Sequence, residues 1–103
     1  MSDVFSRRHV HHYPKDLKLI RAVSLQELSD WFVQQFEGLP QLQERARDLT
    51  ELREILSPIF KEIREDDNVW ICQSRHRGPL LGHEGVALVR NERPAIYIRV
   101  IQY

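Results

Sequence analysis

The residues best suited to bind a ligand lie in the last third of the chain, and they are basic or aromatic. Arginine neutralises phosphates and pairs with carboxylates, while aromatic rings stack on bases or anchor protein interfaces. The stretch Arg75-His76-Arg77 precedes a Gly-Pro pair and is typical of a basic loop, the kind of segment that often carries function on a rigid scaffold. We predict an interaction surface formed by Arg75, His76, Arg77, Arg90, Arg93, Tyr97, Arg99 and Tyr103.

Residues with catalytic character are few. Cys72 sits in an apolar run, so we expect a small buried side chain and not an activated thiolate. His83 has the chemistry of a general base, but a histidine at the start of a strand is more often a structural, hydrogen-bonded residue. Gly82 and Gly85 around it predict a tight strand entry or a bulge. The sequence has no glycine-rich phosphate loop, nucleophile elbow or paired histidines on a helix, so we expect no enzymatic activity and no cofactor.

Three histidines near the N-terminus, His9, His11 and His12, invite a metal-binding interpretation. Their spacing places His9 and His11 on one side of an extended strand. A zinc site needs further ligands. These would have to come from elsewhere in the chain, from Asp3, Asp16, His76 or His83. The spacing matches no closed zinc pattern, so we expect a surface histidine cluster and no metal site.

The charges sum to zero but are unevenly distributed along the chain. Residues 1–24 carry five Lys/Arg and two Asp/Glu, residues 25–67 carry five and eleven, and residues 68–103 carry five and two. We therefore expect an acidic helical side and a basic sheet side, an arrangement that steers partners by charge or serves solubility. A chain with zero net charge is unlike the strongly basic domains that usually bind nucleic acid.

Four stretches of the chain predict strands. Two apolar, β-branched runs, Val86–Arg90 and Ala95–Gln102, flank the residues 91–94 and predict a hairpin with a turn between them. Two further runs, Val69–Ser74 and Leu17–Val23, predict a third and a fourth strand, although the alternation in Leu17–Val23 is imperfect.

The two faces of the last predicted strand differ in character. Ile96, Ile98 and Val100 share one face, which is uniformly aliphatic and is expected to face the core. Tyr97 and Arg99 fall on the other face, which mixes aromatic, charged and aliphatic side chains as a half-exposed face does.

A capping-box signature marks the start of the first predicted helix. Ser24 is followed three residues later by Glu27, and an apolar stripe at helical spacing then runs from Leu25 to Glu37. Trp31 lies at the edge of this stripe, where we expect it to be a core residue rather than part of an interface.

A second helical pattern begins at Pro40 and keeps its apolar spacing as far as Arg64, across Pro58. A proline inside a helix removes a hydrogen bond and clashes with the preceding turn. Two outcomes fit: one helix kinked near Pro58, or two helices with Ser57 as the N-cap of the second. The unbroken stripe favours a kinked or closely abutting pair on the same face.

Together these patterns predict an N-terminal arm over residues 1–16 and a single α+β domain over residues 17–103. We expect two or three helices packed on one face of a three- to four-stranded, mainly antiparallel sheet. No apolar stretch approaches the length of a membrane span, and the single cysteine fits a reducing compartment. We therefore expect a cytoplasmic protein that does not bind membranes.

The function that best fits these features is a small non-enzymatic protein-interaction module, such as a regulator, an inhibitor or a subunit of a complex. The alternative is a nucleic-acid-binding protein that uses the basic sheet and loop surface. If the final strand forms an edge of the sheet, its backbone can also pair with a second copy and make a homodimer.

Overall fold

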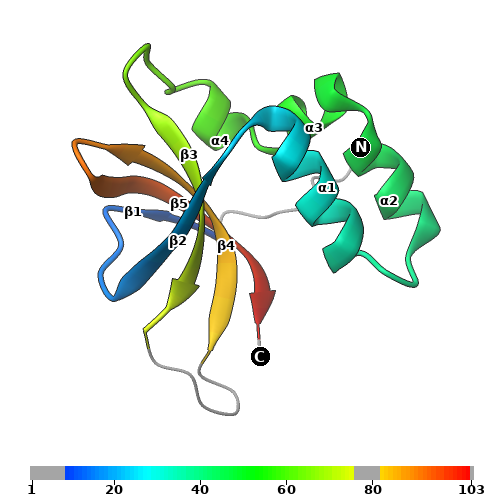
Figure 1. Ribbon diagram of the computed structural model, residues 1–103, viewed down its shortest axis with the longest axis horizontal. Coiled ribbons are helices and arrows are strands. Elements are labelled where there is room, and N and C mark those ends of the chain that lie inside the picture. The colour runs from blue at the N-terminus through cyan, green and yellow to red at the C-terminus, as the bar shows by residue number, and fades with distance from the viewer. Residues whose placement is uncertain (1–8, 76–81, 103) are drawn as a thin grey trace.

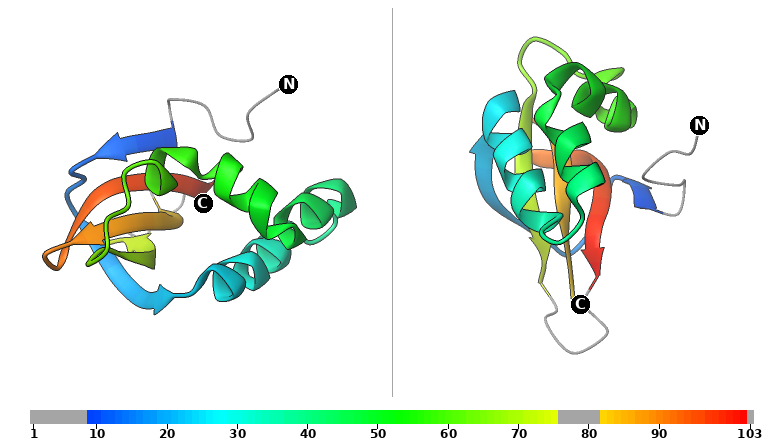
Figure 2. Two further views of the ribbon diagram at one scale, coloured as in Figure 1. Left: turned by 90° about the horizontal axis from the view of Figure 1, so that it is seen from above. Right: turned by 90° about the vertical axis from the view of Figure 1, so that its right-hand side faces the viewer.

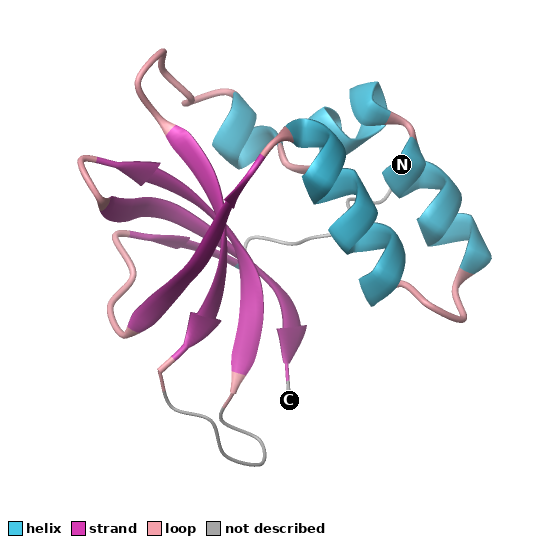
Figure 3. Ribbon diagram, in the orientation of Figure 1, coloured by secondary structure: helices cyan, strands magenta, loops and turns pink. Residues whose placement is uncertain are grey.

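The computed structural model describes residues 9–75 and 82–102, and within them the chain forms four helices and five strands (Figure 1). The elements are β1 Val10–His12, β2 Leu17–Val23, α1 Leu25–Gln35, α2 Pro40–Arg47, α3 Leu49–Ile55, α4 Ser57–Phe60, β3 Asn68–Ser74, β4 His83–Arg90 and β5 Arg93–Gln102. The predicted α+β class is confirmed. The sheet has five strands where at most four were expected, and there are four helices where at most three were expected. Figure 3 shows that the helices lie together on one side of the sheet.

Every pair of neighbouring strands is antiparallel, and the strands lie in the order β1-β5-β4-β3-β2. The right panel of Figure 2 shows this order across the sheet, with β2 at one border and β1 at the other. The additional strand, β1, comes from the stretch expected to be an arm. Its residues Val10–His12 pair with Ile96, Tyr97 and Ile98 of β5. Over that stretch the final strand is therefore not an edge of the sheet. A homodimer formed by pairing two copies of this strand would require such an edge, so that condition is not met there.

The β4–β5 hairpin turns through two residues. Asn91 and Glu92 have φ values of 53° and 65°, which is the left-handed conformation that a two-residue hairpin turn of type I′ requires. The predicted turn over residues 91–94 is therefore too long, because Arg93 and Pro94 belong to β5. Pro94 stands near the start of its strand, where a missing N–H interrupts the ladder least.

A bulge makes β2 change face along its length. The register between β2 and β3 shifts between Leu19 and Arg21, so Ile20 is the extra residue. Its side chain is 40% exposed. Leu19 consequently packs on the side of the sheet without helices, while Val23 packs against the helix-covered side. The extra residue accounts for the imperfect alternation of this strand in the sequence.

The predicted capping box starts α1. The Ser24 hydroxyl accepts the backbone N–H of Glu27 at 3.1 Å, and the Glu27 carboxylate accepts the backbone N–H of Ser24 at 3.0 Å. The helix ends at Gln35, two residues before the expected end at Glu37.

The second helical pattern is broken twice, which neither predicted outcome anticipated. Asp48 ends α2 and caps α3, because its carboxylate accepts two backbone N–H groups of the next turn at 3.0 and 3.2 Å. Pro58 then lies in the first turn of the short α4, where backbone N–H groups have no partner within the helix, so the missing N–H costs no hydrogen bond. Leu56, and not Ser57, occupies the N-cap of α4. No helix among the described residues is long and apolar enough to cross a membrane.

The helices and the sheet bury one shared apolar core. The sheet supplies Val69, Ile71, Val86, Leu88, Ile96 and Ile98, and the helices supply Leu28, Trp31, Phe32, Ala46, Leu52, Leu56 and Ile59. The predicted core face of β5 is confirmed at Ile96 and Ile98, and Val100 packs at the border of the same core. The buried hydroxyl of Ser29 donates to the carbonyl oxygen of Ala46 at 2.6 Å, which joins α1 to α2 within the layer.

Trp31 tests the assignment of this core. Its side chain is 7% exposed, and its ring meets Phe32 edge-on with centroids 5.1 Å apart. We expect Trp31→Ala to lower the free energy of unfolding by about 3–5 kcal/mol in urea denaturation, because contacts are lost and a cavity remains. Gln34→Ala, on the exposed side of the same helix, is the control and should change stability by about 0.5 kcal/mol or less. A loss below about 1 kcal/mol for Trp31→Ala would place this ring outside the core.

Candidate functional site

The face of the sheet that no helix covers, here called the helix-free face, has a small apolar cluster of its own. This cluster consists of Leu17, Cys72, Ala87, Val89 and Tyr97, with Leu19 and Trp70 packed at its border. Among the described residues Tyr97 is the largest side chain that is fully buried, with 1% of its surface exposed. The sequence placed Tyr97 on a half-exposed face, and this expectation is wrong for the ring itself.

Gly85 provides the space that the Tyr97 ring occupies. A Cβ atom at Gly85 would lie 2.9 Å from Cε1 of Tyr97 and 2.0 Å from the carbonyl oxygen of Ile98. The register between β4 and β5 shifts between Glu84 and Gly85, where Glu84 pairs with Ile101 and Gly85 with Arg99. The extra residue is Val100, so the bulge lies on β5 opposite Gly85 and not on the glycine-flanked stretch of β4. Next to this gap the Tyr97 hydroxyl and Nδ1 of His83 form a hydrogen bond of 2.9 Å.

The link between β1 and β2 crosses one end of the helix-free face. The two strands stand at opposite edges of the sheet, and residues 13–16 alone connect them. In the right panel of Figure 2 this link passes behind the sheet, on the side away from α1 and α2. At one end the N–H of Tyr13 donates to the carbonyl of Ala95 at 2.9 Å. At the other end the N–H of Arg75 donates to the carbonyl of Asp16 at 2.9 Å.

Between the link, β1, β4 and β5 lies a pocket of about 430 Å³, here called the basic pocket. It is lined by Val10, His11, His12, Pro14, Lys15, Leu17, His83, Tyr97 and Arg99. Five of these nine side chains are basic, and none of the nine, all of them in the described part of the chain, is acidic. An anionic group that enters the pocket therefore meets the fixed positive charges of Lys15 and Arg99, and it lies beside histidines that become positive when protonated.

The two histidines nearest Tyr97 are held toward their neutral forms. Partial burial, then the charge of Arg99 and then that of His9, lower the pKa of His11 below its ordinary value. Partial burial, then Arg99 and then His11, lower the pKa of His83 in the same way. Because both imidazoles and Arg99 gather around one ring, protonating either histidine adds positive charge to a site that is already positive.

The structure brings only part of the predicted interaction surface to this pocket. Tyr97 and Arg99 line it, and Arg75 touches the link at the end of β3 through its backbone. Arg93 is exposed at the other end of β5, where it pairs with Arg90 across the hairpin. His76, Arg77 and Tyr103 lie outside the described residues.

Arg90 is engaged in a structural ion pair away from the basic pocket. Its Nε and Nη2 atoms donate to the two carboxylate oxygens of Asp67 at 3.0 and 2.7 Å, and Nη2 also donates to the carbonyl of Glu62 at 3.1 Å. The hydrogen bond from Arg90 is the main reason that the pKa of Asp67 is lowered. This bidentate contact joins β4 to the segment after α4, so Arg90 serves the fold.

Sequence reasoning did not assign His11, His12, Lys15 and His83 to the interaction surface. The sequence indicates a surface histidine cluster or a metal site for the histidine-rich stretch, and a base or a structural residue for His83. Within the described residues no group of three or more His, Cys, Asp or Glu side chains is placed to hold a metal ion. The information that was missing is the pairing of β1 with β5, which sets His11 beside Tyr97 with ring centroids 6.1 Å apart.

Cys72 is the buried side chain that the sequence predicted. It is fully buried in the cluster of the helix-free face, and burial raises the pKa of its thiol to about 12. A thiol with this pKa stays protonated at neutral pH, so its chemistry is that of a small apolar side chain.

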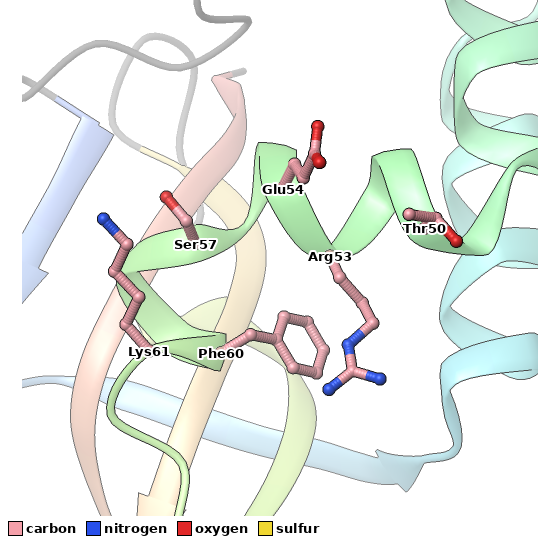
Figure 4. A pocket seen from close by; sticks show the side chains of 6 residues that line it. All are labelled: Thr50, Arg53, Glu54, Ser57, Phe60 and Lys61. Atoms are coloured by element: carbon pink, nitrogen blue, oxygen red, sulfur yellow. The ribbon is translucent and has the colours of Figure 1, made fainter.

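A second hollow, on α3 and α4, offers less to a ligand. Figure 4 shows the Arg53 side chain beside the Phe60 ring, with Ser57 and Glu54 pointing away from them. The guanidinium carbon of Arg53 lies 5.5 Å from the centre of that ring, so the cation already covers the apolar part of the hollow. Glu54 also adds a negative charge next to it.

Comparison of the chain with protein-family models, with curated proteins and with solved structures finds no match to any of them.

The charge of the basic pocket leads to a prediction about stability in acid. Because the folded-state pKa values of His11 and His83 are lowered, the unfolded chain takes up protons first, near pH 6.5. The stability that these neutral imidazoles contribute is complete above this pH and is lost as the pH falls through their lowered values. We expect the double variant His11→Gln, His83→Gln to lose less free energy of unfolding than the natural protein between about pH 7.5 and about pH 5.5.

Urea denaturation at the two pH values measures this difference. The carboxylates of Glu27 and Asp67 do not interfere, since their pKa values are lowered from ordinary values that already lie near 4. Equal losses in the variant and the natural protein would show that the two histidines do not couple protonation to folding.

Proposed function

We propose that the protein is a non-enzymatic protein-interaction module that binds an acidic segment of a partner on the helix-free face, with a partner carboxylate in the basic pocket. The observation that carries this proposal is the lining of the pocket, which has five basic side chains and no acidic one among its nine described residues. Charge-assisted hydrogen bonds to a carboxylate are among the stronger polar contacts in proteins. The pocket volume of about 430 Å³ fits a single side chain and its solvent better than a long polymer.

The other end of the helix-free face favours a peptide over a nucleic acid. A hollow of about 560 Å³ lies there, lined by Leu19, Asp66, Asn68, Trp70, Val89, Asn91 and Glu92. Its two carboxylates would repel a phosphate backbone that continued across the face from the basic pocket. The indole of Trp70 and the side chain of Leu19 offer the partly buried apolar contact that protein interfaces use.

Nucleic-acid binding is the second candidate, because the basic pocket would also accept a phosphate. The separation of the predicted arginines weakens this candidate. Arg90 is paired with Asp67 at the far end of the sheet, and no continuous basic track joins it to Arg99 within the described residues. Nucleic-acid binders neutralise several phosphates along such a track.

The test measures binding of a fluorescent hexa-aspartate peptide and of a single-stranded oligothymidine by anisotropy. We expect the peptide to bind, and Arg99→Gln to weaken its binding by roughly tenfold or more, because a charge-assisted hydrogen bond contributes about 1.5–3 kcal/mol. Arg93→Gln is the matched control, since it removes an exposed arginine from the opposite end of the same strand. The second candidate would be favoured if the oligonucleotide bound more strongly than the peptide and if added salt weakened its binding more than that of the peptide.

A further inference from the structure

His11 and His83 approach the same tyrosine from two different strands. The ring centroids of His11 and Tyr97 are 6.1 Å apart, and those of His83 and Tyr97 are 5.5 Å apart. The first histidine belongs to β1 and the second to β4, with Tyr97 on β5 between them. Two titratable groups that are far apart in the sequence therefore act on one site.

The titratable and charged groups around these histidines come from β1, the link and β5, and His9 also acts on His11 through its charge. His12 and Arg99 line the pocket from β1 and β5, and Lys15 lines it from the link. The nearest carboxylate along β4, that of Glu84, accepts a hydrogen bond from Gln73 at 2.7 Å and is not among the residues that line the pocket. On β3 the hydroxyl of Ser74 accepts the backbone N–H of His83 at 3.0 Å and carries no charge.

The direction of the bond between His83 and Tyr97 depends on whether Nδ1 of His83 carries a proton. When Nδ1 of His83 is unprotonated, it accepts the proton of the Tyr97 hydroxyl at the observed 2.9 Å. When Nδ1 carries a proton, it donates to the Tyr97 oxygen, and the hydroxyl proton becomes available to another acceptor. A carboxylate in the pocket would be that acceptor. It would also compensate the positive charge that the protonated histidine brings beside Arg99.

We infer that the basic pocket is a proton-coupled carboxylate site, in which binding of an acidic side chain draws a proton from solvent onto His83 and His11 and in which the Tyr97 hydroxyl turns to donate to the bound carboxylate. This inference rests on the proposed function and adds its regulation. The only bonds that change are those to the proton: an N–H bond forms on the imidazole as hydronium or a buffer acid gives up its proton, and the proton returns to the solvent when the ligand leaves. The affinity for an acidic segment consequently rises as the pH falls, and the partner is held more tightly under mildly acidic conditions.

The coupling is measured by isothermal titration calorimetry with the hexa-aspartate peptide at about pH 8 and about pH 5.5. Aspartate side chains stay largely ionised in this range, so a change reports on the protein. We expect affinity to increase by roughly tenfold or more at the lower pH, which corresponds to a ligand-induced rise of about one pKa unit in the histidines. Titrations in two buffers with different ionisation enthalpies should show net proton uptake on binding at intermediate pH.

Three variants locate the coupling. His83→Gln keeps a side chain that can bond to Tyr97 but does not titrate, and it should reduce both the pH dependence and the proton uptake. Tyr97→Phe removes the turning hydroxyl, and it should weaken binding mainly at the lower pH. Lys18→Gln is the control, because Lys18 is exposed on β2 and is not among the residues that line the pocket, so the ratio of the two affinities should stay unchanged.

The outcomes separate the inference from the proposed function. Binding with equal affinity at both pH values and without proton uptake would overturn the inference and leave the acidic-segment site in place. No binding at either pH would overturn both. The double variant His11→Gln, His83→Gln, with folding verified by circular dichroism, gives a further check. If its affinity for the peptide depended on pH as strongly as that of the natural protein, the protons would bind elsewhere and the inference would also be overturned.

Discussion

The short connection between the two edge strands is the constraint on which the rest of the sheet depends. Strands lie about 4.8 Å apart, so a flat five-stranded sheet would separate its edges by roughly 19 Å. The five Cα–Cα steps from His12, through residues 13–16, to Leu17 span at most about 18 Å when fully extended. They are not fully extended, since Tyr13 and Asp16 have φ values of 49° and 63°. The sheet must therefore twist and curl, and the link passes over its helix-free face (Figure 2).

This curl explains how Tyr97 becomes buried on a face that no helix covers. The link and the two outer strands close around one end of the face, and Gly85 leaves room for the ring where β5 bulges opposite it. The bulge at Ile20 has the matching role at the other edge, because it directs Leu19 to this face and Val23 to the helix-covered core. One sheet thus supports two apolar clusters, and β2 contributes to both.

The same closure segregates the charges. Acidic side chains form structural contacts outside the basic pocket, as Asp67 does with Arg90, Glu51 with Arg45 and Glu27 with Arg21. The basic pocket collects basic side chains from β1, the link, β4 and β5, of which Lys15 and Arg99 are permanently charged, and the nine described residues that line it include no carboxylate. Such a site costs stability when its histidines become charged, and perturbed titratable groups gathered in a hollow are more frequent at binding sites than elsewhere.

The sequence by itself determined the local elements, because they depend on neighbouring residues. The capping box of Ser24 and Glu27, the bounds of β2, the hairpin and the buried Cys72 all follow from spacing of two, three or four residues along the chain. The break at Asp48 was also encoded locally, since Asp48 caps the next helix, but the continuous apolar stripe concealed it. Only the tertiary structure decided the site. It pairs β1 with β5 and places Arg90 in an ion pair with Asp67, away from Arg99. It also brings the rings of His11 and His83 next to the ring of Tyr97. Those contacts join residues that are distant in the sequence, and no local pattern records which strands become neighbours.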